Sequence, residues 1–364
     1  LYGLDPEAAR EPLEELYARE GRHTDLVRFW RGEIERYDRL SKESSGPQAA
    51  QRAAALRYRL GELLGGTLSR PDEAEVCYRE LLERDADQEP ARDALEVLLR
   101  EHGRDLPLCA LLDERAQRAT SAGDKEAAAL IRLDQAAASE RLDKTDEAME
   151  QLESALRGAS QATTRTRALR NLVRLYRAAR NYEPLARVLG TFADEPQLSA
   201  HEQSALRAEL GALLLRELKR PDEAAGAFSK ALELDAMNVP AARGLADIYR
   251  GQGRWSEAAL AHEREVAAKV DRGRRVWLFG QLGTIRKRLG ELPKARDAFL
   301  SALQLDSKSL VALRGLADVA RLLSDPQRLA QALEALAELS PSPIDRRESR
   351  RELAEVAAKQ LNNP

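Results

Sequence analysis

The sequence of 364 residues has few aromatic side chains and only two cysteines. Aromatic residues make up 4% of the chain and charged residues 33%, a balance that favours thin layers of Ala and Leu under a solvated surface over one deep core. Two cysteines are too few for a disulfide scaffold. We therefore expect Cys77 and Cys109 to be buried free thiols in a reducing compartment.

Long apolar runs and an excess of one charge are also missing. No uninterrupted apolar run approaches the roughly 18 residues needed to cross a bilayer, and no signal-like leader is visible. A net charge of −3 gives no overall attraction to nucleic acid or to anionic membranes, so any electrostatic preference must be local. Because the chain begins with Leu1 rather than Met, we expect an excerpt of a longer chain, and we expect a cytoplasmic location.

Motifs for catalysis are absent as well. The sequence has no phosphate-cradling glycine loop, nucleophile elbow or cysteine-pair motif. Gly251 and Gly253 lie where a helix is expected to end and are better explained as a C-cap. The four histidines stand singly, without metal-ligand spacing: His23, His102, His201 and His262. We therefore predict no enzymatic activity, no metal site and no cofactor.

The segment from Ser204 to Asn238 contains a pattern that recurs along the chain. It reads as two short helices, separated near Pro221 because proline offers no N–H and disfavours helix in the residue before it. Leucines at spacings of three and four form the apolar stripe of the first helix: Leu206, Leu210, Leu213 and Leu214. Small residues and one ring form the buried face of the second: Ala224, Ala227, Phe228, Ala231 and Leu232. Gly211 interrupts the first stripe, which predicts close approach of the second helix.

At these residues the chain resembles a tetratricopeptide repeat, a helix-turn-helix unit of about 34 residues that stacks into a solenoid. Leu210-Gly211, Ala224, Phe228 and the segment 231–235 match the signature positions of the family, whereas Ala236 stands in place of the usual proline. The resemblance implies an all-α, right-handed superhelical solenoid. It also implies that first helices line a concave face and second helices a convex back.

The pattern predicts a single solenoid over residues 1–364, with about nine repeats. We expect a first repeat at 7–40, a linker-like insertion at 41–48, a continuous array over 49–345 and an incomplete last repeat at 346–364. Leu1 to Pro6 resembles the tail of a preceding second helix. Two kinds of repeat alternate, so the underlying period is a pair of roughly 73 residues.

The register of the repeat places particular side chains in the predicted groove. The second half is rich in guanidinium groups and includes one tryptophan: Arg170, Arg174, Arg177, Arg243, Asp247, Arg250, Trp277, Thr284, Lys287, Arg288, Arg314, Asp318 and Arg321. The corresponding positions early in the chain are acidic: Glu11, Glu15, Glu62 and Asp93. We take the first set as the candidate partner-binding site.

Two features of this set have alternative interpretations. The motif Arg-Gly-Leu-Ala-Asp-x-x-Arg occurs at Arg243 and again at Arg314. It indicates either local ion pairs at i,i+4 and i,i+3, or an aspartate that orients arginines toward carboxylates of a partner. Trp277 is either an anchor for a partner or a packing residue between repeats.

The function that these patterns favour is a protein-interaction scaffold. It would capture an extended peptide or a partner surface in the concave groove, with acidic segments favoured over the second half. An RNA-binding helical array and a self-assembling structural solenoid are the alternatives. We expect a protein or peptide partner, no nucleic acid and no membrane insertion.

Overall fold

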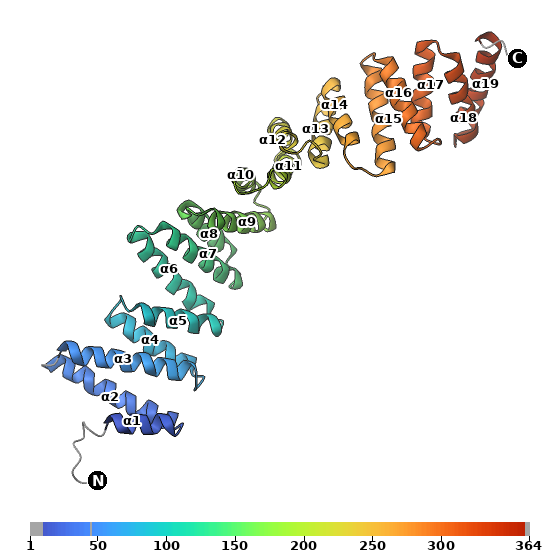
Figure 1. Cartoon of the computed structure of the whole chain (residues 1–364). Helices are drawn as coiled ribbons and strands as arrows, with labels where there is room; N and C mark the ends of the chain where they lie inside the picture. Colours follow the sequence, from blue (N-terminus) through green and yellow to red (C-terminus); the bar gives the residue numbers. More distant parts are fainter. Residues whose placement is uncertain (1–9, 44–45, 361–364) are drawn as a thin grey trace, which may run out of the picture. The chain divides into compact units, whose positions relative to one another are not determined.

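The computed structural model describes residues 10–43 and 46–360, and within these ranges it contains helices and no strands (Figure 1). The prediction of an all-α fold is therefore confirmed. The segment from Leu1 to Pro6, which we interpreted as the tail of a second helix, lies outside the described residues, as does the end of the incomplete last repeat.

The chain divides into two compact units, Leu1–Ser160 (unit 1) and Gln161–Pro364 (unit 2). The described helices of unit 1 are α1 Arg10–Arg19, α2 His23–Glu43, α3 Gly46–Gly65, α4 Pro71–Arg84, α5 Glu89–Glu101, α6 Asp105–Ser121, α7 Lys125–Arg141 and α8 Thr145–Gly158. Those of unit 2 are α9 Ala162–Ala178, α10 Tyr182–Ala193, α11 Ala200–Arg216, α12 Pro221–Leu234, α13 Val239–Gly251, α14 Trp255–Ala267, α15 Arg272–Arg288, α16 Leu292–Leu305, α17 Leu310–Leu323, α18 Pro326–Leu339 and α19 Pro343–Gln360.

Within each unit, helices pair along the chain. From α1 to α18, every odd-numbered helix packs against the even-numbered helix that follows it, so each pair is one repeat with a first and a second helix. The last helix, α19, packs against α18 and opens a further repeat. A continuous array over residues 49–345 stays a prediction. The turn after α13 confirms the predicted C-cap, because Gly253 adopts a left-handed φ of 72° and its N–H donates to the Arg250 carbonyl.

Most of the predicted linker at 41–48 is helical instead, so this prediction was wrong. Helix α2 continues to Glu43 and α3 begins at Gly46, with residues 44–45 outside the described ranges. The Ser41 hydroxyl donates to the Asp38 carbonyl at 2.9 Å, inside the last turns of α2. Pro47 stands in the first turn of α3, where a missing N–H breaks no helical hydrogen bond.

The contact predicted for Gly211 is present. A Cβ atom on Gly211 would lie 2.7 Å from ring atoms of Phe228, a separation too short for any side chain. The other edge of the ring lies against Gly244 of α13, where a Cβ atom would collide with it as well. The phenyl ring is therefore held between the backbones of two successive first helices.

The same arrangement recurs two repeats later. Gly283 on α15 and Gly315 on α17 both lie against the buried Phe299 ring on α16. The structure thus gives a physical reason for the alternation seen in the sequence. Phe228 and Phe299 each lie between glycines of the first helices on both sides, so in these parts of unit 2 two repeats form one packing module.

Exchanging Gly244 for alanine tests this module. We expect a loss of about 1–3 kcal/mol in unfolding free energy, because the new methyl group collides with a ring that Gly211 already confines. Gly226, inside α12, has open space around its Cα, and alanine there should gain up to about 1 kcal/mol from helix propensity. Urea unfolding followed by circular dichroism measures both variants. Equal effects at the two sites would contradict the close contact of Gly244 with the Phe228 ring.

Candidate functional site

Every residue of the predicted site lies on an odd-numbered helix, the first of its repeat. Helix α9 carries three of the arginines, and α13, α15 and α17 carry the others. The side chains that are exposed are Arg170, Arg174, Arg177, Arg243, Asp247, Trp277, Arg288, Arg314 and Arg321. Arg250, Thr284, Lys287 and Asp318 are half-buried.

Ion pairs between successive first helices engage many of these cations. Each joins a basic residue to a carboxylate one repeat further along the chain. The pairs are Arg177 with Glu209, Lys287 Nζ with Asp318 Oδ2 at 2.8 Å, Arg314 with Asp345 at 2.7 Å, and Arg321 with Glu352 at 2.9 Å. The row of guanidinium groups is thus partly neutralised within the protein.

The motif that begins at Arg243 contains one of its two expected local ion pairs. Asp247 Oδ1 lies 3.8 Å from Arg250 Nη1, the predicted i,i+3 contact. Among the described residues Arg243 has no ion pair with Asp247; it pairs with Glu265 on α14. The copy in α17 repeats this pattern: Asp318 pairs with Arg321 at 3.0 Å, and Arg314 pairs with Asp345. Capture of carboxylates from a partner by these arginines stays a prediction.

Glu265 is the centre of a polar cluster that the sequence did not reveal. Its carboxylate is fully buried and accepts hydrogen bonds from Arg274 at 2.8 and 3.0 Å and from Arg243 at 3.1 Å. Burial alone would raise the pKa of Glu265, but the hydrogen bonds from the two arginines outweigh burial and lower it. The cluster joins α13, α14 and α15 through one ionised carboxylate.

Trp277 packs against this cluster. The Arg274 guanidinium carbon lies 4.0 Å from the centre of the Trp277 ring, and His262 of α14 meets the ring edge-on at 5.8 Å. The tryptophan nevertheless remains 40% exposed. Packing between repeats and an accessible aromatic surface therefore coexist at this residue.

The remaining predicted residues of α15 make local contacts. The Thr284 hydroxyl donates to the Gly280 carbonyl at 2.9 Å, inside the helix. The Arg288 guanidinium carbon lies 4.6 Å from the centre of the Trp255 ring, a cation–π contact.

Residues of the predicted groove line hollows in both units. In unit 2, a hollow of about 290 Å³ between α17, α18 and α19 is lined by Arg314, Asp318 and Arg321, so the structure brings these predicted residues together. In unit 1, a hollow of about 520 Å³ between α3, α4 and α5 is lined by Glu62 and Asp93, two of the predicted acidic positions.

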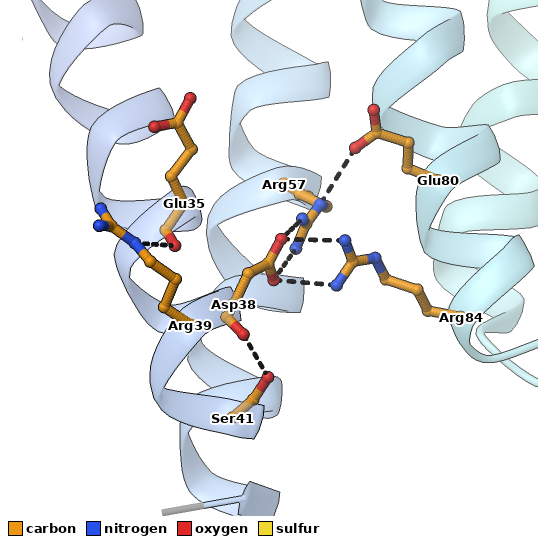
Figure 2. Close-up of polar contacts among 7 residues, drawn as sticks. All are labelled: Glu35, Asp38, Arg39, Ser41, Arg57, Glu80 and Arg84. Atoms are coloured by element: carbon orange, nitrogen blue, oxygen red, sulfur yellow. Dashed lines mark hydrogen bonds and ion pairs between the residues drawn. The ribbon is translucent and has the colours of Figure 1, made fainter. Parts of the chain in front are cut away.

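A second polar cluster, in unit 1, was also missed by the sequence reasoning. Figure 2 shows the Asp38 carboxylate of α2 between two guanidinium groups, Arg57 of α3 and Arg84 of α4. Arg57 is buried and also donates to Glu80 at 3.2 Å. Burial would raise the pKa of Asp38, but hydrogen bonds from the two arginines lower it overall. One signal could have revealed the cluster, because Arg57 interrupts the apolar stripe of α3 between Ala53 and Leu60.

The two cysteines lie on second helices, Cys77 on α4 and Cys109 on α6, and both are free. Cys77 is buried as expected, and burial raises the pKa of its thiol to about 11, so it is protonated at neutral pH. Cys109 is only half-buried, a correction to our expectation. In the part of the chain that the structure describes, no helix combines the length and apolarity needed to cross a bilayer.

The contacts between glycines of first helices and aromatic rings of second helices identify the type of repeat. They pair a small residue on a first helix with a ring on the second, at the positions where the tetratricopeptide signature has small and large residues. The chain is an array of tetratricopeptide-like repeats.

Among known proteins, a curated relative matches part of this tetratricopeptide-like array. No protein-family model matches the sequence. Over 117 residues the array is 36% identical to the CTR9 homolog of Arabidopsis thaliana, a stretch that covers 32% of this chain and 10% of that protein. The matched stretch is thus about a tenth of the length of that curated relative.

Several solved structures are similar to the array at low sequence identity. PilF of Pseudomonas aeruginosa is 18% identical, covering 74% of this chain and 98% of its own, with a TM-score of 0.32. Yeast Tom70 is 13% identical, with coverages of 97% and 96% and a TM-score of 0.32. A tetratricopeptide repeat protein from Parabacteroides merdae is 17% identical, with coverages of 78% and 99% and a TM-score of 0.30.

Proposed function

We propose that the array is a protein-interaction scaffold that binds a peptide or partner surface along its first helices, and that α9 takes an acidic segment. One observation carries the proposal. Helix α9 contains five arginines and no carboxylate, and Arg170, Arg174 and Arg177 on it are exposed. Guanidinium groups bind carboxylates through paired, charge-assisted hydrogen bonds, and arginine is enriched at the residues that dominate binding energy.

The internal ion pairs leave room for such a partner. The contact of Arg177 with Glu209 is exposed on both sides, and ion pairs of this kind contribute about 0–1 kcal/mol. Replacing the contact of Arg177 with Glu209 by a contact with a carboxylate of a partner therefore costs little free energy. Arg170 lies close enough to Glu202 to lower the pKa of that carboxyl, although the hydrogen bonds from Ser199 are the larger cause.

Charge reversal tests the proposal. Peptides are first selected against the full chain from a random library, and Arg170→Glu, Arg174→Glu and Arg177→Glu are then combined in one variant. We expect acidic peptides among the binders, and a rise in Kd of about tenfold or more with a flatter salt dependence in the variant, because attraction across the interface becomes repulsion. Fluorescence anisotropy at several salt concentrations measures both quantities.

A matched control reverses three exposed cations on second helices of the same unit, Arg187, Lys230 and Arg264. These have no ion pair with other described residues, and the variant changes net charge by the same amount. Unchanged Kd in the α9 variant, or equal losses in both variants, would contradict the proposal. Tighter binding of single-stranded RNA than of any selected peptide, abolished by the α9 variant, would replace it with RNA binding.

A further inference from the structure

Helix α15 combines a cationic composition with an exposed aromatic side chain. It carries six arginine and lysine residues and no carboxylate, so none of its charges is neutralised within the helix. Trp277 lies in the middle of this sequence and is 40% exposed. Tryptophan is highly buried on average, so a tryptophan left this accessible among cations on a first helix needs an explanation.

The Trp277 ring is held in one orientation by its neighbours. The Arg274 guanidinium carbon lies over the ring, 4.0 Å from its centre, and Arg274 is itself fixed by hydrogen bonds of 2.8 and 3.0 Å to the buried Glu265. His262 meets the ring edge-on at 5.8 Å. A side chain that is already ordered loses little conformational entropy when a partner packs on it, so Trp277 is preorganised as an anchor.

Apolar surface continues from Trp277 to the next first helix. Val311 of α17 is 61% exposed, and its Cγ1 lies 3.6 Å from the position that a Cβ atom would take on Gly280 of α15. Gly280 follows Trp277 by three residues, so the two share one face of α15. Two successive first helices therefore present adjacent apolar surface, in contrast to the single exposed apolar residues that are normal on any protein.

Arginines of the neighbouring first helices border this apolar surface. Arg314 follows Val311 by three residues and is exposed on the same face of α17. Arg243 of α13 is exposed and donates to Glu265, as does Arg274. Within the part of the chain that the structure describes, Arg314 reaches a carboxylate only through Nη2, and Arg243 only through Nε and Nη2. A guanidinium has five N–H donors, so each arginine can bind a further carboxylate.

Carboxylates on the same helices favour a peptide over a nucleic acid as the occupant. Asp247 is exposed one turn after Arg243, and Asp318 is half-buried one turn after Arg314. They repel the closely spaced phosphates of RNA, each of which carries a negative charge. A peptide can carry one or two carboxylates at the arginines and apolar side chains elsewhere.

We propose that Trp277, Val311, Arg243 and Arg314, here called the tryptophan surface, bind a partner segment in which a large apolar side chain stands next to carboxylates. The apolar side chain packs on Trp277 and Val311, and the carboxylates beside it bind the two arginines. The inference rests on the proposed function as a protein-interaction scaffold. It adds a selectivity that charge alone lacks, because α9 takes an acidic segment whereas the tryptophan surface also requires an apolar residue in it.

The test uses the full chain and peptides selected against it from the random library. We expect one class of binders with Leu, Ile or Phe next to Asp or Glu. For this class, Val311→Asp should raise the Kd about tenfold or more, because a carboxylate replaces apolar surface and repels the peptide. Val311 lies in the first turn of α17, where a carboxylate suits the helix N-terminus, so the fold is kept. Fluorescence anisotropy measures the Kd.

Tryptophan fluorescence reports on the same surface directly. Peptides of this class that lack tryptophan should protect Trp277 from quenching by acrylamide, because an apolar side chain then covers the ring. The sequence has three tryptophans, and Trp30 is already buried. Loss of the protection in Trp277→Phe assigns it to Trp277 rather than to Trp255. Trp277→Ala should also raise the Kd about tenfold or more, as expected for an aromatic anchor.

The matched control is Leu260→Asp, which places the same charge at a similarly exposed apolar residue on a second helix of unit 2. An unchanged Kd in this control supports the tryptophan surface. Absence of the apolar and acidic class, an unchanged Kd in Val311→Asp, or an equal loss in Leu260→Asp overturns the inference. If acidic peptides still depend on the arginines of α9 in that case, the scaffold function stands; if no peptide binds at all, both fail. Protection of Trp277 by single-stranded RNA and by no peptide would replace the peptide with a nucleic acid.

Discussion

Replacing Phe228 with alanine is expected to lower the free energy of unfolding of unit 2 by about 3–5 kcal/mol. The ring is 2% exposed and fills the space between Gly211 and Gly244, neither of which has a side chain that could move into the cavity. The lost area belongs to two interfaces, that of α12 with α11 and that of α12 with α13. In a repeat array each interface couples neighbouring repeats, so the variant should also weaken cooperativity.

Urea unfolding by circular dichroism measures the stability, and amide hydrogen exchange shows which helices open first. We expect α11 to α13 to lose protection before the helices of unit 1. Leu260→Ala is the matched control, because Leu260 is a large apolar residue on a second helix of the same unit but is exposed. It should change stability by no more than about 0.5 kcal/mol. Comparable losses in the two variants would show that Phe228 is not held as described.

The helical pairs could be predicted because their signals are local. The spacing of Leu206, Leu210 and Leu213, the break at Pro221 and the glycine at position 211 all act within one repeat, and the fold places each as expected. The segment 41–48 shows the limit of composition. Its Ser, Gly and Pro suggest a loop, yet Asp38 near the end of α2 is held by arginines of α3 and α4, and these contacts are invisible in a local window.

The candidate site was predictable only as far as the helix that carries each residue. The register placed Arg243, Arg314 and Arg321 on first helices correctly. Their partners lie on other helices: Glu265 on the following second helix, and Asp345 and Glu352 on the next first helix. In the sequence, a carboxylate one repeat away looks like any other surface charge. The neutralisation of these arginines could therefore be recognised only in the folded structure.

Acidification is expected to destabilise unit 2 through His262. This residue of α14 is 1% exposed, and neither ring nitrogen has a hydrogen-bond partner among the described residues. Burial lowers the pKa of His262 from its ordinary 6.5 to about 4. The charged groups around it act in both directions: Glu265 and Asp247 raise the pKa, and Arg250 and Arg274 lower it.

The sign of the effect follows from proton binding. Between pH 6.5 and about 4 the unfolded chain protonates this histidine and the folded chain does not, so stability falls as the pH drops through this window. The full difference corresponds to about 3 kcal/mol, at about 1.4 kcal/mol for each pKa unit. Above pH 6.5 the neutral imidazole contributes no pH dependence.

His262→Leu separates this histidine from the other titrating groups of the chain. The substitution keeps an apolar side chain of similar size against Trp277, so stability at pH 7.5 should stay within about 1.5 kcal/mol. Urea midpoints measured from pH 7.5 down to 4.5 should then fall less steeply in the variant than in the unaltered chain. Glu265, whose pKa is lowered by Arg274 and Arg243, loses its stabilising effect only at lower pH, since its ordinary value is 4.5. Identical slopes in the two proteins would therefore show that His262 is hydrated or hydrogen-bonded in solution rather than buried as a neutral ring.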